Sequence, residues 1–168
     1  INDLSASGDN LGNNIAVYND AGVVTLGSTS YVKVNSNGDN KGIYVKNGGV
    51  LNISGNIEII SLEDSGDYNY GIYMDSDSSN TLNLNNTVLD LYGKSIGVYS
   101  GWDSIDFLAG NTINLVGSAG IGILYEVTNN TPVSVVSPVV ENSGIINVSK
   151  GTGIYIYDTS NIGSKDVN

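Results

Sequence analysis

The sequence predicts an all-β protein, a right-handed, three-sided parallel β-helix of about five coils, each of roughly 25–33 residues. Three observations support this fold class. Short segments such as 50–54 alternate apolar and polar residues, which is the period of a strand with one buried face. The 22 glycines, together with Asn, Asp and Ser, fill the gaps between these segments, as turn residues do. One tripeptide also recurs along the chain, and such a repeat is typical of a solenoid.

The recurring tripeptide is Gly-(Ile/Val)-Tyr. It begins at Gly42, Gly71, Gly97 and Gly153, with looser copies at Ala16 and Gly122. The third positions of these six copies lie 26, 29, 26, 25 and 31 residues apart. A β-sandwich would also contain short strands, but it has no reason to repeat one tripeptide at every third strand. A left-handed β-helix would need a hexapeptide period, which this sequence lacks.

Two further alternating segments separate successive copies, so each coil is expected to contain three strands that stack on those of the next coil. The first strand has the inward pairs Val24 and Leu26, Leu51 and Ile53, Leu82 and Leu84, Ile105 and Phe107, and Val133 and Val135. The second has Val32 and Val34, Ile57 and Ile59, Leu89 and Leu91, Ile113 and Leu115, and Ile146 and Val148. The third carries the tripeptide and has Ile43 and Val45, Ile72 and Met74, Ile96 and Val98, Ile121 and Ile123, and Ile154 and Ile156.

The outward positions of the third strand predict a ladder of aromatic rings along the outside of the coil. In register, these positions are Tyr18, Tyr44, Tyr73, Tyr99, Leu124 and Tyr155. Stacked rings stabilise neighbouring strands, and they also suit contact with sugars or proteins, so both roles remain open. Loop aromatics add to the candidates. The candidate binding residues are therefore Tyr44, Tyr73, Tyr99, Tyr155, Trp102, Tyr68 and Tyr70.

Composition excludes several classes of partner and reaction. The chain has 17 carboxylates against 6 Lys or Arg residues and a net charge of -11, which argues against nucleic acid and against an anionic membrane surface. It has no Cys and therefore no thiol nucleophile or thiolate metal site. It also has no His, the commonest general base and transition-metal ligand. Glu58 and Asp90 lie one coil apart, but no Arg or His accompanies them for glycan cleavage. We therefore expect no enzyme, no catalytic residue, no metal site and no cofactor.

The whole chain, residues 1–168, is expected to be a single β-helix segment of a longer protein. Residue 1 is Ile rather than Met, and no basic segment followed by an apolar run opens the chain. No stretch approaches the roughly 18 apolar residues of a membrane span, so no membrane insertion of this segment is expected.

Three segments carry a resemblance to a known family. Residues 41–49 (KGIYVKNGG), 49–55 (GVLNISG) and 143–148 (SGIINV) resemble passenger domains of type V autotransporters, most of all the very large outer-membrane adhesins of fusobacterial type. The resemblance covers nearly the whole chain. It implies a β-helix that is exported through the outer membrane to the bacterial cell surface. It also implies adhesion to a host cell-surface protein or glycan, or to another bacterium.

Two other functions remain open. One is a carbohydrate-cleaving β-helix of the pectin lyase or tailspike type, for which this segment supplies only carboxylates. The other is a spacer that binds nothing itself. The unpaired edges of the first and last coils also predict end-to-end self-association.

Overall fold

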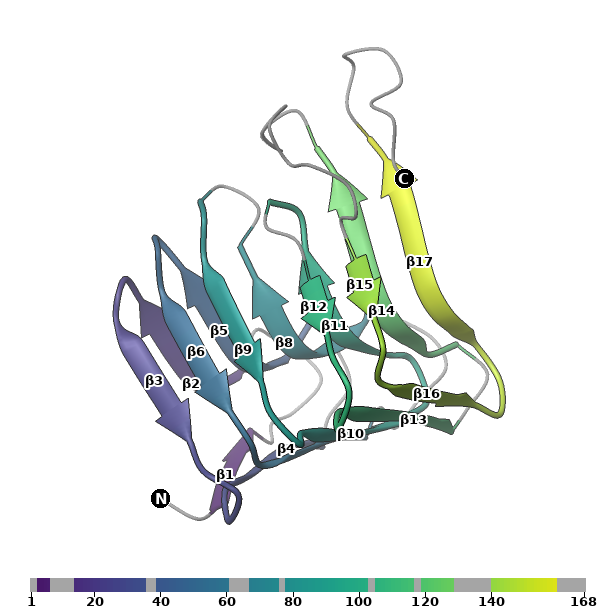
Figure 1. Cartoon of the computed structure of the whole chain (residues 1–168). Helices are drawn as coiled ribbons and strands as arrows, with labels where there is room; N and C mark the ends of the chain where they lie inside the picture. The colour runs from purple at the N-terminus through teal and green to yellow at the C-terminus, as the bar shows by residue number, and fades with distance from the viewer. Residues whose placement is uncertain are drawn as a thin grey trace.

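The computed structural model describes residues 3–6, 14–35, 39–60, 67–75, 78–102, 105–116, 119–128 and 140–159. All regular elements in these ranges are β-strands, and the strands pair in parallel (Figure 1). The described part of the chain contains no helix long and apolar enough to cross a membrane. The predicted fold class is confirmed as an all-β parallel solenoid, while its right-handedness and its three-sidedness stay predictions.

Two six-stranded sheets run the length of the solenoid. The first, called here the straight sheet, consists of β1 (Asp3–Ala6), β4 (Tyr31–Asn35), β7 (Asn56–Ile60), β10 (Val88–Tyr92), β13 (Thr112–Val116) and β16 (Ile145–Val148). The second, called the tyrosine sheet, consists of β2 (Ile15–Asp20), β5 (Lys41–Lys46), β8 (Asn69–Met74), β11 (Ser95–Ser100), β14 (Ile121–Val127) and β17 (Thr152–Asp158). Strands of the two sheets alternate along the chain, so each coil contributes one strand to each sheet.

The remaining strands form a shorter, divided set. β3 (Val23–Leu26), β6 (Val50–Ile53) and β9 (Thr81–Leu84) make one sheet, and β12 (Ile105–Phe107) pairs with β15 (Val140–Asn142). From β3 to β15 the chain makes about four turns. The sequence predicts that the strand of the last coil next to β12 contains Val133 and Val135, but β12 pairs with residues 140–142 instead. Val133 and Val135 lie outside the described residues. Two apolar runs compete for one position there, and periodicity alone does not choose between them.

The register agrees with the spacing of the tripeptide. Along the tyrosine sheet, the third positions pair as Tyr18 with Tyr44, Tyr44 with Tyr73, Tyr73 with Tyr99, Tyr99 with Leu124, and Leu124 with Tyr155. A slip by one residue would turn every side chain to the other face, so the buried face specifies this register. The predicted aromatic column is therefore confirmed position by position.

Apolar side chains from all three sets of strands fill one core inside the solenoid. Pairs predicted to face inward, such as Ile57 and Ile59 or Ile72 and Met74, are fully or almost fully buried there. Burial of this kind provides most of the favourable free energy of folding. The last coil is more open, because no described strand follows it, and Val148 and Ile154 are partly exposed.

A column of glycines runs through the tyrosine sheet and explains the glycine of the tripeptide. A Cβ added at Gly97 would lie 2.5 Å from the carbonyl oxygen of Gly122, and one added at Gly71 would lie 2.7 Å from that of Gly97. The same close approach to backbone occurs at Gly42 and Gly122. Real Cβ atoms do not come this close to an oxygen, so adjacent coils can stack here only where the side chain is missing.

The strands of this sheet change facing at the glycine column, which corrects two predictions. Ile96 and Ile121 were expected to point inward with Val98 and Ile123, but they pack in a separate cluster on the outer side. Residues three apart, such as Ile96 and Tyr99, would face opposite ways in a regular strand. Here both face outward, so the alternation that predicts inward positions fails across the glycine.

Candidate functional site

The outer cluster gives the tyrosine sheet a second apolar layer. Ile96, Tyr99 and Leu124 are its buried members. The partly buried residues packed against them are Tyr68, Tyr70, Tyr73, Ile121 and Tyr157. The sheet changes facing at the glycines, so two rows of side chains meet on this side. One row precedes the glycines and includes Tyr70 and Ile96, and the other is the row of third positions of the tripeptide. The rings of Tyr70 and Tyr73 show the contact, with centroids 5.0 Å apart and planes at 86°.

The aromatic ladder is continuous over four coils. Ring centroids are 5.5 Å apart between Tyr18 and Tyr44, 5.2 Å between Tyr44 and Tyr73, and 4.5 Å between Tyr73 and Tyr99. The first two contacts are edge-to-face and the third is stacked, which are favoured geometries for aromatic pairs. Exposure changes along the ladder, from 51% at Tyr18 to 6% at Tyr99 and back to 47% at Tyr155. The middle of the ladder is thus a floor, and its ends are open.

Two adjoining cavities follow this floor, and together they are called here the tyrosine groove. The larger, of about 390 Å³, is lined by Tyr68, Tyr70, Tyr73, Ile96, Tyr99, Ile121, Leu124, Glu126, Tyr155 and Tyr157. The smaller, of about 340 Å³, shares the first three tyrosines and is completed by Asp39, Lys41 and Asp67. Concave, largely apolar surfaces with a few converging polar groups are the usual form of binding sites.

Carboxylates accept hydrogen bonds from phenol hydroxyls at the groove and beside it. Tyr99 donates a hydrogen bond of 2.8 Å to Oε2 of Glu126, while Thr159 donates one of 3.1 Å to the other oxygen. Tyr44 donates one of 2.9 Å to Asp75 in the next coil. Hydrogen bonds to charged acceptors are stronger than neutral ones. The bonds from Tyr99 and Thr159 hold the carboxylate of Glu126 in place.

Lys41 is a cation at one end of the groove. Its Nζ lies 2.9 Å from Oδ1 of Asp39, and it stands over the rings of Tyr70 and Tyr73 at 5.4 and 5.0 Å from their centroids. Lys94 similarly lies 4.8 Å from the ring centroid of Tyr68. An ammonium group over a tyrosine face is attracted by the negative charge density of the ring. The groove therefore already binds the chain's own cations.

Three tyrosines of the groove, Tyr70, Tyr73 and Tyr157, have a raised pKa. Burial raises the pKa of Tyr73 to about 12, and the charge of Asp75 adds to this shift. Burial also raises the pKa of Tyr70 and of Tyr157, and nearby carboxylates add to both shifts. At neutral pH, these side chains are uncharged rings with electron-rich faces.

Most of the predicted site residues come together. Five of the seven, Tyr68, Tyr70, Tyr73, Tyr99 and Tyr155, line the larger cavity.

The other two do not line it. Tyr44 lies one coil away with its ring against Tyr73, and the carbonyl oxygen of Trp102 accepts a hydrogen bond from the core residue Tyr125.

Sequence reasoning missed Ile96, Ile121, Glu126 and Tyr157 as lining residues. Tyr157 could have been found, since it lies two residues after Tyr155 and therefore on the same face.

The middle row of the outer face of the straight sheet is polar, and its side chains bond to one another, while Tyr92 and Val116 form an exposed apolar pair beside it. Lys33 forms an ion pair of 2.8 Å with Glu58, which also accepts a hydrogen bond from Tyr31. Asp90 pairs with Glu58 in register, as predicted, but it accepts a hydrogen bond of 2.8 Å from Asn114. Both carboxylates are engaged by neighbours, so nothing distinguishes them as an acid and base pair.

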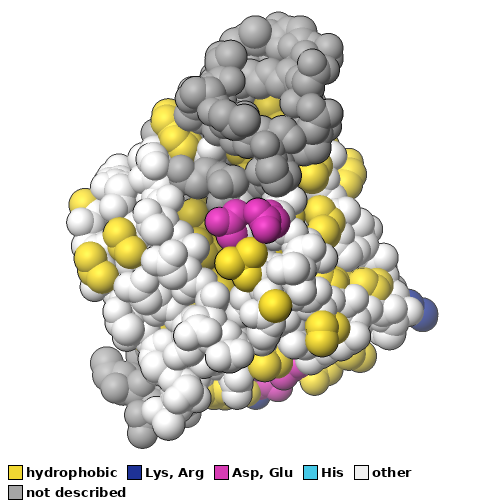
Figure 2. Space-filling model, viewed as in Figure 1, with side chains coloured by type: hydrophobic (Ala, Val, Ile, Leu, Met, Phe, Trp, Pro, Cys, Tyr) yellow, Lys and Arg dark blue, Asp and Glu magenta, His cyan; other side chains and the backbone are white. Residues whose placement is uncertain are grey.

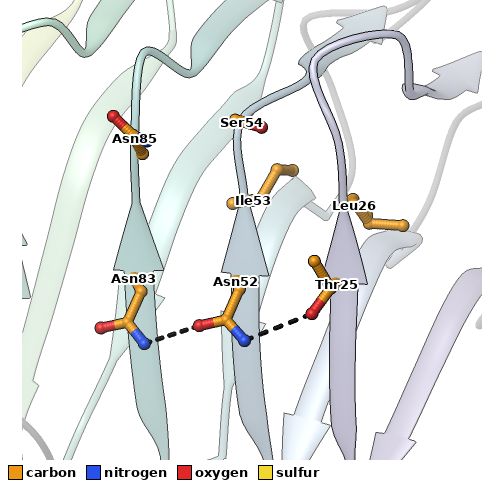
Figure 3. Close-up of a pocket in the computed structure, with 7 residues that line it drawn as sticks. All are labelled: Thr25, Leu26, Asn52, Ile53, Ser54, Asn83 and Asn85. Carbon is orange, nitrogen blue, oxygen red and sulfur yellow. Dashed lines mark hydrogen bonds between the residues drawn. The ribbon is translucent and has the colours of Figure 1, made fainter.

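The third face carries another polar ladder. Asn83 donates to Asn52, and Asn52 to Thr25, across β9, β6 and β3 (Figure 3). Farther along, Asp106 and Glu141 are exposed register partners. In the view of Figure 2, acidic side chains lie near the middle and at the lower edge of a largely uncharged surface. No group of three or more metal-ligating side chains occurs among the described residues.

Comparison with known proteins adds no relative: no family model, no curated protein and no solved structure matches this chain. The fold and the geometry of the groove are therefore the basis for assigning a function.

Proposed function

We propose that this chain is a structural and adhesive segment of a secreted or surface-anchored bacterial protein, a passenger domain of autotransporter type, and that the tyrosine groove is its contact surface. The observation that carries the proposal is the groove itself. It combines a buried apolar floor with partly exposed tyrosine walls on the outside of a stacked solenoid. Tyrosine is enriched at protein interfaces because it combines a large contact area with a polar tip.

Rigidity of the surroundings supports this function. The walls of the groove stand on strands that are hydrogen-bonded to neighbours in adjacent coils, so their rings are positioned before any partner arrives. Preorganisation lowers the entropy lost on binding. A solenoid also holds such a surface away from the cell, which suits adhesion to a host cell or to another bacterium.

The second candidate function is a spacer, and one observation favours it. The rings of the ladder contact one another, and Tyr99 is almost fully buried, so the column also stabilises the fold. Glycan cleavage is not favoured, since Glu58 and Asp90 are both engaged by neighbouring side chains.

A cell-binding assay separates adhesion from a spacer role. The purified 168-residue protein and a variant with Tyr155→Ser and Tyr157→Ser would be labelled and bound to epithelial cells and to partner bacteria. The matched control is Tyr18→Ser, which removes an equally exposed ring of the same ladder outside the groove. Adhesion predicts that binding is lost only in the groove variant. Absence of binding by the folded wild-type protein would identify the segment as a spacer.

A further inference from the structure

We infer that the tyrosine groove binds a basic polypeptide segment by taking a lysine or arginine side chain of that partner between its rings. The inference rests on the proposed adhesive function and specifies the partner's chemistry. It goes beyond aromatic contact in general, because a cation makes demands on the lining that an apolar or a sugar ligand does not.

The lining of the larger cavity has the composition of a cation site. Six of its residues are tyrosines, one is Glu126, and none is a lysine. The face of an aromatic ring carries negative charge density, and several faces around one cavity are the usual way in which proteins bind ammonium groups. The exposed walls at the Tyr155 end leave room for a side chain to enter, while Tyr99 and Leu124 close the floor.

The carboxylate of Glu126 is placed to complete such a site. Hydrogen bonds from Tyr99 and Thr159 fix its two oxygens, at 2.8 and 3.1 Å. Glu126 also pairs in register with Tyr157, so a tyrosine and a charged acceptor stand side by side on adjacent strands. Arginine and lysine bind most strongly where a charged acceptor and a ring face are both available.

Lys41 displays the binding mode within the chain. Its ammonium group lies over two tyrosine faces of the smaller cavity and against the carboxylate of Asp39. The larger cavity shares Tyr70 and Tyr73 with that arrangement and has its own carboxylate. A partner's cation in the larger cavity would therefore repeat contacts that the fold already makes one step away.

The long-range electrostatic field of the protein also favours a basic partner. The chain carries a net charge of -11, and Asp39, Asp67 and Glu126 all line the groove. An acidic surface raises the encounter rate with a basic segment.

A neutral glycan finds fewer partners in this groove. Sugar hydroxyls need convergent amide, hydroxyl and carboxylate groups. The asparagine ladders of this protein lie on the other two faces, from Thr25 to Asn83 and from Asp90 to Asn147. Within the larger cavity, the polar side-chain atoms belong only to phenols and to one carboxylate.

Calorimetric titration of the 168-residue protein tests the inference. The probes are a short peptide containing lysine and arginine, the same peptide with acetyl-lysine and citrulline in their place, and a neutral galactose oligosaccharide. We expect only the basic peptide to bind, and more weakly as salt rises. Glu126→Gln should weaken this binding about tenfold, and Tyr157→Leu about three- to fivefold.

The matched control is Glu141→Gln, which removes the same charge from the third face and should change the affinity less than about twofold. Equal losses in the two glutamate variants would reduce the effect to general charge attraction and overturn the inference. Binding of the oligosaccharide alone, with the basic peptide inactive, would overturn the ligand class but leave the adhesive function standing. If no probe binds, the inference fails as well, and the cell assay then decides on adhesion separately.

Discussion

The two long sheets of this solenoid have the same number of strands, yet only one of them carries a buried apolar cluster on its outer face. The straight sheet keeps one facing along each strand, and its outer side is a polar ladder typified by Lys33, Glu58 and Asp90. The tyrosine sheet changes facing at its glycine column and carries a second apolar cluster outside. Glycine, repeated once per coil, thus allows the outer face of this sheet to form a groove instead of a flat, solvated surface.

The difference lies in how the strands of each sheet present their side chains. A strand that keeps one facing brings only every second residue to its outer side. A strand that changes facing brings two rows of side chains to the outside, here the rows of Tyr70 and Tyr73. The groove is therefore a consequence of backbone geometry as much as of tyrosine content.

The largest expected effect comes from breaking the glycine column. Gly97→Ala places a Cβ 2.5 Å from the carbonyl oxygen of Gly122 and 3.1 Å from Leu91, so the coils must separate. We expect a loss of about 3 kcal/mol in the free energy of unfolding. The measurement is urea denaturation followed by circular dichroism. Gly27→Ala is the control, because an added Cβ there meets nothing within 4 Å. Equal stability of the two variants would refute the role of the column.

A smaller effect is expected from the outer cluster. Ile96 is almost fully buried outside the main core, so Ile96→Ala should cost about 2 kcal/mol, as truncations in an ordinary core do. Ile145→Ala, on the straight sheet at a position 58% exposed, should change stability by less than about 0.5 kcal/mol. Denaturation of both variants checks this pair. A neutral Ile96→Ala would mean that the outer cluster is only a solvent-exposed surface.

The stability of the protein at alkaline pH should depend on the tyrosine sheet. The pKa of Tyr73 is about 12 in the folded protein, against 10.0 for a free phenol, because burial disfavours the phenolate. A raised folded pKa stabilises the protein fully below pH 10 and loses that contribution as pH rises through about 12. We therefore expect stability to fall in this window. Tyr73→Phe should reduce the fall, and spectrophotometric tyrosine titration beside denaturation measures it. An unchanged pH dependence in the variant would exclude Tyr73 as its source.

The smallest expected change is a loss of stability in acid that arises from the straight sheet. The hydrogen bond from Lys33, and then that from Tyr31, lower the pKa of Glu58 below its usual 4.5. A lowered folded pKa stabilises the protein above pH 4.5, and the contribution disappears as pH falls through the folded value. Because the pair is partly exposed, it should contribute only about 0.5 kcal/mol. Glu58→Gln should remove this acid-dependent part, as denaturation at pH 7 and at pH 3 would show. A larger acid dependence in the variant would contradict this.

Sequence periodicity predicted most of the strands and the register of the tyrosine column, because both depend on local patterns. Alternation assigns pairs such as Ile57 and Ile59 to the core without knowledge of their neighbours. It failed at Ile96 and Ile121, since the rule assumes a regular strand and the glycine interrupts it. It also failed at β15, because the alternation at Val133 and Val135 fits a strand as well as residues 140–142 do, and it is 140–142 that pair with β12.

The candidate site was predicted by residue type and completed only by geometry. Tyr73, Tyr99 and Tyr155 follow from the repeat, since each occupies the third position of its tripeptide. Glu126 and Tyr157 join them because β14 and β17 lie side by side in one register. The repeat, which aligns Leu124 with Tyr155, also aligns Glu126 with Tyr157 two residues later, but the structure was needed to place both side chains in one cavity.

The all-β class, the coil repeat and the aromatic column follow from the amino-acid sequence, because each depends on a period that local chemistry imposes. The change of facing at the glycine column, in contrast, is visible only in the folded protein. Close approach of Gly97 to Gly122 is a contact between coils, and no single strand contains it. Because adjacent coils approach closely at the glycines, the outward tyrosines line a groove that also contains the carboxylate of Glu126.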